Sequence, residues 1–415
     1  MRTQFAPTFA RVYFLGVISV NDKKQVPDVR FEGFSGPWEK QKLGKNINWS
    51  KGSGLPKSEL NQNKIGFPAL HYADLYKFSA VEDSVINWTE ADGGQLIPCN
   101  SILFPMSDVT PNGLARTSTL SIPNIRAGGD VLIGQLDANI LAEFISFQIN
   151  ANSSQILPLI TGTTVKHISS TALSTLDVMC TNLEEQAAIG NFFRSLDEAI
   201  ALEKQQYNKM VSIKKAMLEK MFPKKGATVP EIRFEGFTEP WTLSSIGKIM
   251  SIRNDVAEPN NYTFDVELEN IESDKGTLIG DTSVRTKTRS FFKMGDTLFG
   301  RLRPYLNKWW LADRDGLKSG EIWALSPFND NSNEFIYLVV QGKEFLESAN
   351  ISSGTKMPRA DWGKISETEI LVPKYNEQTA IGNFFRKIDN LIHLHTQSIE
   401  KLQNIKEACL GKMFV

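Results

Sequence analysis

Cysteine and histidine, the residues from which disulfide frameworks and most zinc sites are built, are scarce in this sequence. The three cysteines (Cys99, Cys180 and Cys409) are far apart and include no CxxC pair, and the four histidines form no ligand set. These absences argue against a disulfide-stapled fold and against a metal site. They fit a reducing compartment, so we expect a cytoplasmic protein that binds no metal.

Long hydrophobic runs are also missing. No apolar stretch reaches the ~18 residues that a membrane-spanning helix needs. The short apolar stretch from Arg11 to Val20 leaves a secretory signal open, but no small-residue cleavage pattern follows it. The interpretation we favour is a disordered or weakly attached extension over residues 1–25.

Neither sign of charge is in excess. The chain has 46 basic and 47 acidic residues, a net charge of −1 and 41% hydrophobic residues, which is ordinary for a globular protein. Its 415 residues allow about two to four domains. Any binding of nucleic acid must therefore come from local basic patches.

Signatures of catalysis are absent as well. The sequence has no Asn-Pro-Pro-Tyr or Asn-Pro-Pro-Phe tetrad, no glycine-rich cofactor loop and no phosphate-binding loop of the Walker A type. No nuclease set of the Pro-Asp…Glu-x-Lys type stands out, and the acidic residues are unclustered. We predict a binding protein with no catalytic residues and no cofactor. A fused DNA enzyme with an unrecognised active site is the alternative.

The most informative feature that is present is a repeat. Residues 185–194, Glu-Gln-Ala-Ala-Ile-Gly-Asn-Phe-Phe-Arg, return as residues 377–386, Glu-Gln-Thr-Ala-Ile-Gly-Asn-Phe-Phe-Arg, with an offset of 192 (378 − 186). Solenoid repeats are about 20 to 50 residues long, so this period indicates two domain-sized units. The molecule should therefore do one thing at two places.

A second block belongs to the same repeat. Residues 26–34, Val-Pro-Asp-Val-Arg-Phe-Glu-Gly-Phe, return as residues 229–237, Val-Pro-Glu-Ile-Arg-Phe-Glu-Gly-Phe, and a Pro-Trp pair follows each copy, with an offset of 203 (241 − 38). Between the two blocks there is little identity. Two repeated blocks around a divergent region are expected if the divergent regions of the two units recognise different ligands.

A long helix is predicted at the end of each unit. Residues 184–222 contain no proline and are closed by Pro223, residues 181–184 suggest a capping box, and the second copy spans 376–414. Such a helix spans about 58 Å at ~1.5 Å per residue. Apolar residues recur at spacings of 4 and 3, which favours a coiled coil between the two helices over packing of each helix on its own domain. The two seams are Ile189, Phe193, Leu196, Ile200, Glu203, Tyr207, Met210, Lys214, Met217 and Met221, and Ile381, Phe385, Ile388, Ile392, His395, Ile399, Leu402, Lys406, Cys409 and Met413.

Polar residues interrupt the two seams at matching places. Glu203 matches His395, and Lys214 matches Lys406. If a pseudo-two-fold axis makes the helices antiparallel, full overlap places Glu203 against His395. We hypothesise that this central polar pair fixes the register; the alternative is that both side chains are simply solvated.

Each copy of the helix motif keeps one glycine and two phenylalanines. They are Gly190, Phe192 and Phe193 in the first copy and Gly382, Phe384 and Phe385 in the second. A glycine inside a helix costs about 1 kcal/mol relative to alanine, so we expect a close backbone approach there. The second phenylalanine lies on the seam. The first lies off it and needs a partner from its own variable domain or from another subunit.

The variable regions contain the candidate nucleic-acid contacts. Short β-branched and aromatic runs broken by Gly, Pro, Asn and Asp predict mixed α+β domains with curled sheets. From Thr282 to Trp310, seven basic residues stand against the single acid Asp296, with aromatic residues between them. Clustered arginine and lysine bind phosphates or guanine edges, although a charge run can also be a solvated face. The candidate residues are Lys51, Lys57, Lys64, Arg116, Arg126, Lys166, Arg285, Lys287, Arg289, Lys293, Arg301, Arg303, Tyr305, Lys308, Lys356 and Arg359.

Taken together, these motifs resemble the specificity subunit of type I restriction–modification enzymes. The resemblance extends from Val26 to Val415. It rests on the paired helix motifs, on their Lys-Met-Phe ends at 220–222 and 412–414, and on the two Phe-Glu-Gly-Phe…Pro-Trp openings. The stretch 295–301, Gly-Asp-Thr-Leu-Phe-Gly-Arg, is similar to strands of the target recognition domains of that family.

The resemblance implies an architecture and a set of partners. It implies an α+β fold with two target recognition domains, separated by two long antiparallel helices that form a coiled coil in a pseudo-two-fold, cyclic arrangement. Each recognition domain would read one half of a bipartite double-stranded DNA site. The helices would set the spacing and dock two methyltransferase subunits, and restriction subunits would complete the enzyme.

A coiled-coil scaffold without a DNA role is the alternative function. The expected segments are an extension at 1–25, recognition domains at 26–180 and 229–375, and helical spacers at 181–228 and 376–415.

Overall fold

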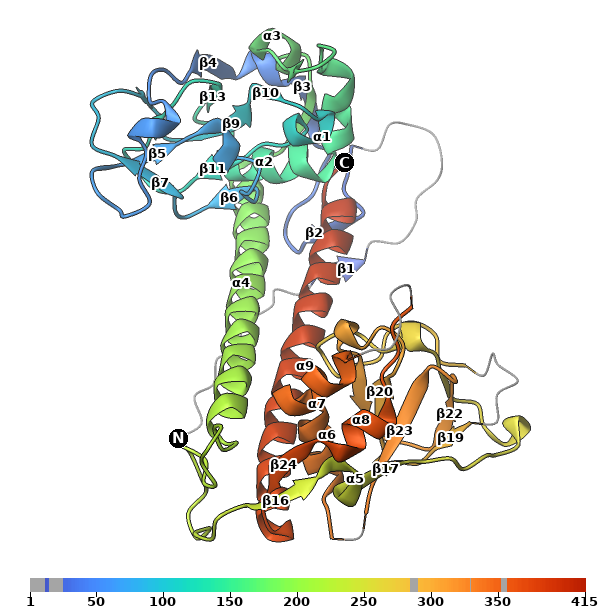
Figure 1. Cartoon of the computed structure of the whole chain (residues 1–415). Coiled ribbons are helices and arrows are strands. Elements are labelled where there is room, and N and C mark those ends of the chain that lie inside the picture. Colours follow the sequence, from blue (N-terminus) through green and yellow to red (C-terminus); the bar gives the residue numbers. More distant parts are fainter. Residues whose placement is uncertain (1–11, 15–24, 284–289, 329, 352–356) are drawn as a thin grey trace. The chain divides into compact units, whose positions relative to one another are not determined.

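The chain folds into two compact units in a computed structural model that describes residues 12–14, 25–283, 290–328, 330–351 and 357–415 (Figure 1). Unit 1 comprises residues 1–203 and 398–415, and unit 2 comprises residues 204–397. Each unit mixes helices and strands, as expected for an α+β protein. No helix in the described part of the chain is long and apolar enough to cross a membrane.

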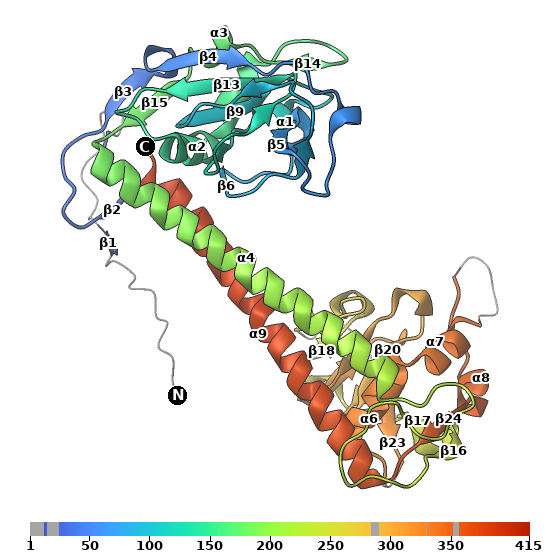
Figure 2. The ribbon, with the colours of Figure 1, turned by 90° about the vertical axis from the view of Figure 1, so that its left-hand side faces the viewer.

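Unit 1 is built around an antiparallel sheet with the strand order β4–β13–β9. The central strand β13 is buried at five of its six positions, which is why it is a nearly continuous apolar run. Helix α2 lies beside this sheet (Figure 2), and its Phe144 and Ile145 belong to the same hydrophobic core as Phe104 of β9 and Leu132 of β13. A mixed sheet, β7–β5–β12–β8, and several two-stranded pairs complete the unit. The elements are β1 (Val12–Phe14), β2 (Val29–Phe31), β3 (Glu39–Lys42), β4 (Ile47–Lys51), β5 (Phe67–Leu70), β6 (Val81–Glu82), β7 (Asn87–Thr89), β8 (Gln95–Leu96), β9 (Ser101–Pro105), β10 (Ser107–Asp108), α1 (Pro111–Leu114), β11 (Thr119–Leu120), β12 (Arg126–Ala127), β13 (Val131–Leu136), α2 (Ala142–Ala151), β14 (Lys166–His167), α3 (Ser170–Leu173) and β15 (Asp177–Cys180).

Unit 2 repeats this plan with different side chains. Its main sheet has the order β17–β23–β20–β21, a second sheet has the order β18–β22–β19, and β16 pairs with β24 as β3 pairs with β15. Strand β23 begins 191 residues after β13, and helix α6 begins 191 residues after α2. The middles of the repeat therefore share a fold although they share little sequence. The elements are β16 (Thr242–Ser245), α5 (Ile246–Ile249), β17 (Met250–Ile252), β18 (Asp265–Val266), β19 (Phe291–Phe292), β20 (Thr297–Gly300), β21 (Trp309–Leu311), β22 (Gly316–Lys318), β23 (Ile322–Pro327), α6 (Asn333–Gln341), α7 (Lys343–Asn350), α8 (Trp362–Glu367) and β24 (Glu369–Val372).

Two long helices contribute to both units. They are α4 (Leu183–Lys220) and α9 (Tyr375–Met413), so the predicted bounds are confirmed to within two residues. The first part of α4 and the last part of α9 lie in unit 1, and the remaining parts lie in unit 2. All twenty predicted seam positions are buried or partly buried. The predicted capping box is one residue too early, because Asn182 accepts the hydrogen bond from the Glu185 amide at 2.9 Å.

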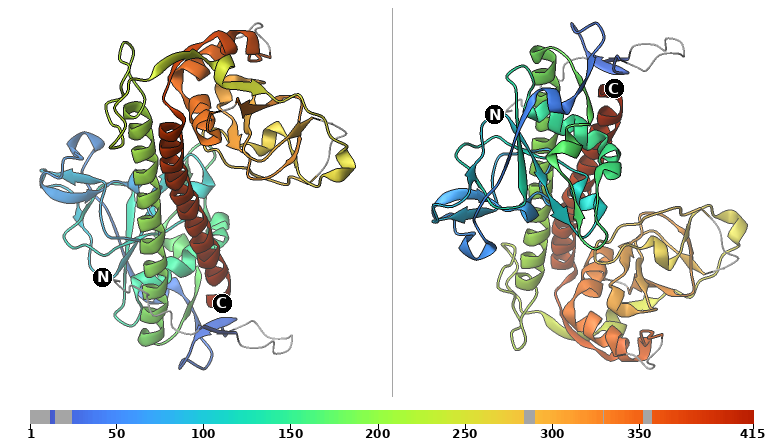
Figure 3. Two further views of the ribbon diagram at one scale, coloured as in Figure 1. Left: turned by 90° about the horizontal axis from the view of Figure 1, so that it is seen from below. Right: turned by 90° about the horizontal axis from the view of Figure 1, so that it is seen from above.

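The helix ends belong to the cores of the units. In unit 1, Phe193 of α4 stacks on Phe414, which follows α9, and also contacts Phe147 of α2, so the helices pack on each other and on their domain (Figure 3). Phe414 lies against Trp38, as Phe222 lies against Trp241 in unit 2. The end of α9 thus packs a phenylalanine on the tryptophan of the first domain opening, as the end of α4 does on the tryptophan of the second. This confirms the cyclic arrangement.

The N-terminal extension is described only over Val12–Phe14. These residues form β1, which pairs antiparallel with β2 of the first domain opening. The remainder of the predicted extension up to residue 24 lies outside the described residues.

Candidate nucleic-acid interface

A buried ion pair joins each domain opening to the start of its long helix. Arg30 binds Glu185 with two hydrogen bonds of 2.6 Å, and Arg233 binds Glu377 with bonds of 2.7 and 2.8 Å. Two parallel N–H···O bonds fix both the distance and the plane of the guanidinium group. The two blocks of the sequence repeat are therefore partners in space, and their glutamates serve the fold.

The glutamine of each motif positions a helix of the variable region. Gln186 accepts from the Leu141 amide at 2.9 Å, just before α2, and Gln378 accepts from the Ser332 amide at 3.0 Å, just before α6. Each glutamine also donates to a backbone carbonyl that precedes its own long helix. The motif thus places both recognition folds on the helices in the same way.

The glycines and off-seam phenylalanines complete these junctions. A Cβ atom on Gly382 would lie 2.5 Å from the Cβ of Glu334, which confirms the predicted close approach; the same contact at Gly190 is looser, at 3.6 Å. Phe192 meets Phe31 edge-on at 5.6 Å, and Phe384 meets Phe234 at 5.7 Å. The off-seam ring therefore contacts the opening of its own domain.

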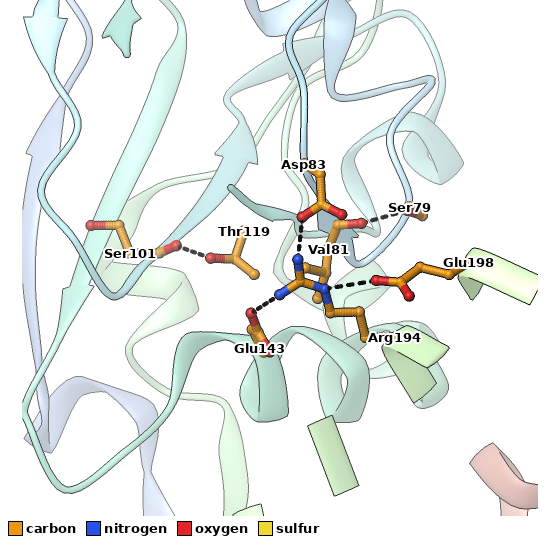
Figure 4. Close-up of polar contacts among 8 residues, drawn as sticks. All are labelled: Ser79, Val81, Asp83, Ser101, Thr119, Glu143, Arg194 and Glu198. Atoms are coloured by element: carbon orange, nitrogen blue, oxygen red, sulfur yellow. Dashed lines mark hydrogen bonds and ion pairs between the residues drawn. The ribbon is translucent and has the colours of Figure 1, made fainter. Parts of the chain in front are cut away.

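The arginine that ends the first motif is surrounded by acids. Arg194 lies 2.7 Å from Asp83, 3.5 Å from Glu143 and 3.3 Å from Glu198 (Figure 4). These carboxylates raise the pKa of Arg194 although partial burial opposes the shift. Arg194 and Glu143 also line a pocket of about 490 Å³ between α2 and α4 in unit 1. Ion pairs between Arg194 and these three carboxylates stabilise this part of unit 1. Because the carboxylates outnumber the arginine, this site is not suited to binding a phosphate.

Two equivalent ion pairs lie on the helix seams. Lys406 of α9 binds Asp197 of α4 in unit 1, and Lys214 of α4 binds Asp389 of α9 at 2.8 Å in unit 2. The two lysines and the two aspartates are each 192 residues apart (406 − 214 and 389 − 197). The polar interruptions at Lys214 and Lys406 are thus paired within the units. The hypothesis of a pair between Glu203 and His395, which are both partly buried, stays a prediction.

In unit 2, the candidate contacts gather around the end of β20. Arg303 and Tyr305 are exposed, and Arg303 has a positive φ of 51° at the start of a 3-10 turn. Lys293 is exposed in the turn before β20, whereas Lys308 donates to the Leu268 carbonyl at 2.8 Å. Four further candidates lie outside the described residues: Arg285, Lys287, Arg289 and Lys356.

Arg301 and Arg359 share one carboxylate. Arg359 donates to the two oxygens of Glu321 at 3.0 and 2.8 Å, and Arg301 Nε lies 3.6 Å from the same group. The bond from Arg359 is the main cause that lowers the pKa of Glu321. Both arginines line a pocket of about 570 Å³ that also contains Lys318 and Trp323.

In unit 1, the candidate contacts are spread more widely. Lys57 is exposed, Lys51 lies 3.4 Å from Asp130, and Lys64 lies over the ring of Trp88 at 5.7 Å. Arg126 lies over the ring of Phe67 at 4.5 Å, and its Nη1 donates to the carbonyl of Asp92 at 2.6 Å. Lys64, Arg126 and the exposed Phe67 thus combine cations and aromatic surface beside the β7–β5–β12–β8 sheet.

Two other predicted DNA contacts in unit 1, Arg116 and Lys166, donate hydrogen bonds to backbone carbonyls of the same unit. The guanidinium of Arg116 donates to the carbonyls of Tyr76 and Leu75, and Lys166 donates to the Gly162 carbonyl at 2.7 Å. Lys40 and Lys42, two further basic residues of unit 1, both bind Asp177 and lower its pKa. These interactions reduce the donors that are available to a ligand.

The comparisons with known proteins agree with this geometry. A family model described as the type I restriction modification DNA specificity domain matches residues 36–211 and 311–404, which is more than half of the chain. The chain belongs to this family. Its sequence is 22% identical over 185 residues to the type I restriction enzyme EcoDI specificity subunit of Escherichia coli, covering 42% of this chain and 41% of that protein. The chain thus matches about two fifths of the length of that curated relative.

A solved structure supports the fold over almost the whole chain. The type I restriction–modification system S subunit from M. genitalium superposes with a TM-score of 0.67 at 16% identity, covering 94% of this chain and 99% of that one. At this identity the likeness concerns the fold. It supports two mixed helix-and-strand units with long helices, as the specificity family resemblance implies.

Several residues important to this specificity-family fold were missed as partners in the sequence. Arg30 and Arg233 stand in the copied blocks, but nothing local shows that they bind glutamates 155 and 144 residues away. At the offset of 191, Glu321 corresponds to Asp130 in the other copy, but Asp130 faces Lys51 and not two arginines. Lys318 corresponds to Ala127. The seam ion pairs left a visible signal, because Lys214 and Lys406 interrupt an apolar pattern at matching places.

Proposed function

We propose that this chain is the DNA specificity subunit of a type I restriction–modification complex. Family membership and the fold support this assignment, and one observation carries it: the two units repeat one framework but place different side chains at equivalent positions. The bridge between Leu302 and Arg359 in unit 2 corresponds to the bridge between Ser107 and His167 in unit 1. One scaffold with two different surfaces suits the reading of two different sequences.

In this proposal, each recognition domain reads one half of a bipartite double-stranded DNA site. The recognition domains correspond to residues 26–180 and 229–375, and the helical spacers to residues 181–228 and 376–415. The spacers set the distance between the half-sites and dock two methyltransferase subunits. Restriction subunits join in the full complex, and this cytoplasmic chain carries no catalytic residues of its own. The candidate basic and aromatic contacts of the two recognition domains would supply the affinity for DNA through phosphates and base edges.

The methylation pattern of the host genome tests this proposal. We expect methylated positions to fall within one bipartite motif of two fixed sequences separated by a fixed spacing. Deletion of the gene for this chain should abolish methylation of that motif while leaving other methylation in place. A genome in which the deletion changes no methylated motif would contradict the assignment.

The scaffold alternative receives no support from the family or from the fold. The substitutions Arg301→Ala and Arg303→Ala separate the two functions, because they remove candidate DNA contacts and leave the long helices intact. A specificity subunit should lose affinity or selectivity for DNA in these variants. Purified chain that cuts or methylates DNA without partners would instead indicate a fused enzyme.

A further inference from the structure

Glu321 holds two arginines that line one pocket in unit 2. Arg359 uses its Nε and Nη2 groups to bind both carboxylate oxygens, and the Nε of Arg301 faces the same carboxylate at 3.6 Å. In the described part of the chain, the Nη1 and Nη2 groups of Arg301 and the Nη1 group of Arg359 have no protein partner. Two guanidinium groups thus keep free donors while the Glu321 carboxylate fixes their positions.

The backbone also fixes the two arginines relative to each other. The amide of Ala360 donates to the carbonyl of Arg301 at 2.8 Å, and the amide of Arg303 donates to the carbonyl of Pro358 at 2.8 Å. The amide of Arg301 donates to the carbonyl of Glu321 at 2.9 Å. Main-chain and side-chain hydrogen bonds therefore connect the three residues of the cluster. The two arginine side chains should lose little conformational entropy when they bind a ligand.

The cluster is better suited to a base edge than to a phosphate. Its single carboxylate offsets one of the two positive charges and would repel a phosphate at close range. A rigid arginine with two parallel donors matches the O6 and N7 acceptors of guanine in the major groove, which is the commonest specific contact of arginine with DNA. A phosphate contact needs only a positive charge. Exposed lysines such as Lys57 and Lys64 supply that charge without a carboxylate to position them.

The pocket that the arginines line also contains a buried lysine. Lys318 is 6% exposed, and its Nζ donates to the carbonyl of Ile322 at 2.8 Å. The pocket is also lined by Trp323 and Trp362, whose rings meet edge-on at 5.9 Å. No salt bridge joins Lys318 to a carboxylate in the described part of the chain, since the nearby Asp296 is bound by Arg253 at 2.6 Å. A buried ammonium without a paired acid is costly to the fold, which favours a role in binding.

We propose that Arg301 and Arg359 read guanine in the second half-site and that Glu321 is the residue that positions both of them. Lys318 adds a positive charge in the same pocket and favours the electron-rich guanine edge over the amino groups of adenine and cytosine. This inference rests on the proposed function, because it names the bases that the second recognition domain selects. Unit 1 has His167 in place of Arg359, so the device belongs to the second half-site alone.

The experiment selects sequences from duplex DNA in which both half-sites are randomised, using the complex purified from its host through a tag on this chain. The variants are Glu321→Gln, Arg301→Lys and Arg359→Lys, with Arg314→Lys as the matched control. Arg314 lies in the same unit, is exposed and pairs with the adjacent Asp313. We expect each arginine variant to lower the preference for guanine at one position by about 10- to 100-fold. Glu321→Gln should lower it at both positions.

The first half-site serves as an internal control for assembly. It should be selected unchanged in every variant, and Arg314→Lys should preserve both half-sites. A wild-type complex that selects no sequence contradicts the proposed function itself. A wild-type complex that selects a second half-site without guanine, or variants that keep its base preferences, overturn this inference alone. An equal loss of affinity for all sequences in Glu321→Gln also overturns it, because a merely structural role predicts that result.

Discussion

Two glycines at the same position of the repeat face different surroundings. A methyl group on Gly382 would meet the Cβ of Glu334 at 2.5 Å, whereas on Gly190 it would meet the Cβ of Glu143 at 3.6 Å, an ordinary contact. Alanine favours a helix over glycine by about 1 kcal/mol, so Gly190→Ala should be neutral or slightly stabilising. Gly382→Ala should destabilise by about 1–3 kcal/mol, because helix α6 must move away. Thermal unfolding of the full-length variants measures both changes, and equal shifts would contradict the structural difference.

The buried Lys318 predicts a pH-dependent stability. Burial, together with the nearby Arg301, lowers the pKa of Lys318 from 10.5 to about 8. Between pH 8 and 10.5, the unfolded chain therefore binds a proton that the folded chain has released, and stability rises with pH in this window. Lys318→Met removes the cost of burying the ammonium, so it should stabilise the protein at pH 7 by up to about 3 kcal/mol.

The advantage of the Lys318→Met variant should shrink as the pH rises from 8 towards 10. The measurement is the unfolding midpoint of both proteins at pH 7, 8, 9 and 10. Lys343→Met, measured in parallel, controls for the exchange of an exposed ammonium for a methionine side chain. Parallel curves for wild type and Lys318→Met would show that the ammonium is not destabilised by burial.

At the scale of elements, the sequence predicts what is local and repeated. Proline positions and the 4/3 apolar spacing locate α4 and α9 to within two residues, because helix formation depends on neighbours along the chain. Strand pairing is not local. The parallel pairing of β5 with β12 joins Ala69 to Arg126, and no turn signal connects them. The arginines that share Glu321 are likewise brought together only by the folded sheet.

The equivalent seam ion pairs predict an energetic coupling between α4 and α9 in each unit. Lys214 and Asp389 are mostly buried, at 13% and 27% side-chain exposure, and burial raises the pKa of Asp389 despite the nearby ammonium. Removing Lys214 leaves that carboxylate without its compensating charge. A double-mutant cycle with Lys214→Met and Asp389→Asn should therefore give a coupling energy of about 1–3 kcal/mol.

The control for this cycle is the pair formed by Lys343 and Glu347. Its two side chains are 77% and 68% exposed, so its coupling energy should stay below about 0.5 kcal/mol. The cycle on Lys406 and Asp197 should match that on Lys214 and Asp389, because the two pairs occupy equivalent places. A seam coupling as small as that of the surface pair would mean that the lysines merely interrupt the apolar seam.

At the scale of the whole molecule, the sequence repeat already indicates the cyclic design. The Lys-Met-Phe motif ends both α4 and α9, and each domain opening carries one Pro-Trp pair. In the structure, Phe414 at the end of α9 packs on Trp38 of the first opening, as Phe222 at the end of α4 packs on Trp241 of the second. What could not be predicted is the function of each basic residue. Arg116 and Arg126 look like free basic residues in the sequence, yet Arg116 binds the carbonyls of Tyr76 and Leu75. Arg126 binds the carbonyls of Asp92 and Gly93 while its guanidinium lies over Phe67.

The duplicated framework predicts that the two recognition surfaces can be exchanged independently. Replacing residues 229–370 by the corresponding region of another family member should change one half of the methylated motif and leave the other half and the spacing unchanged. The reason is that the contacts between each fold and its helix, such as the Arg233–Glu377 and Gln378–Ser332 contacts, use residues from the copied blocks or backbone amides. The measurement is the methylated motif of cells that carry the hybrid chain. If both half-sites changed, the two units would not read DNA separately, and the framework would be a single reader rather than two.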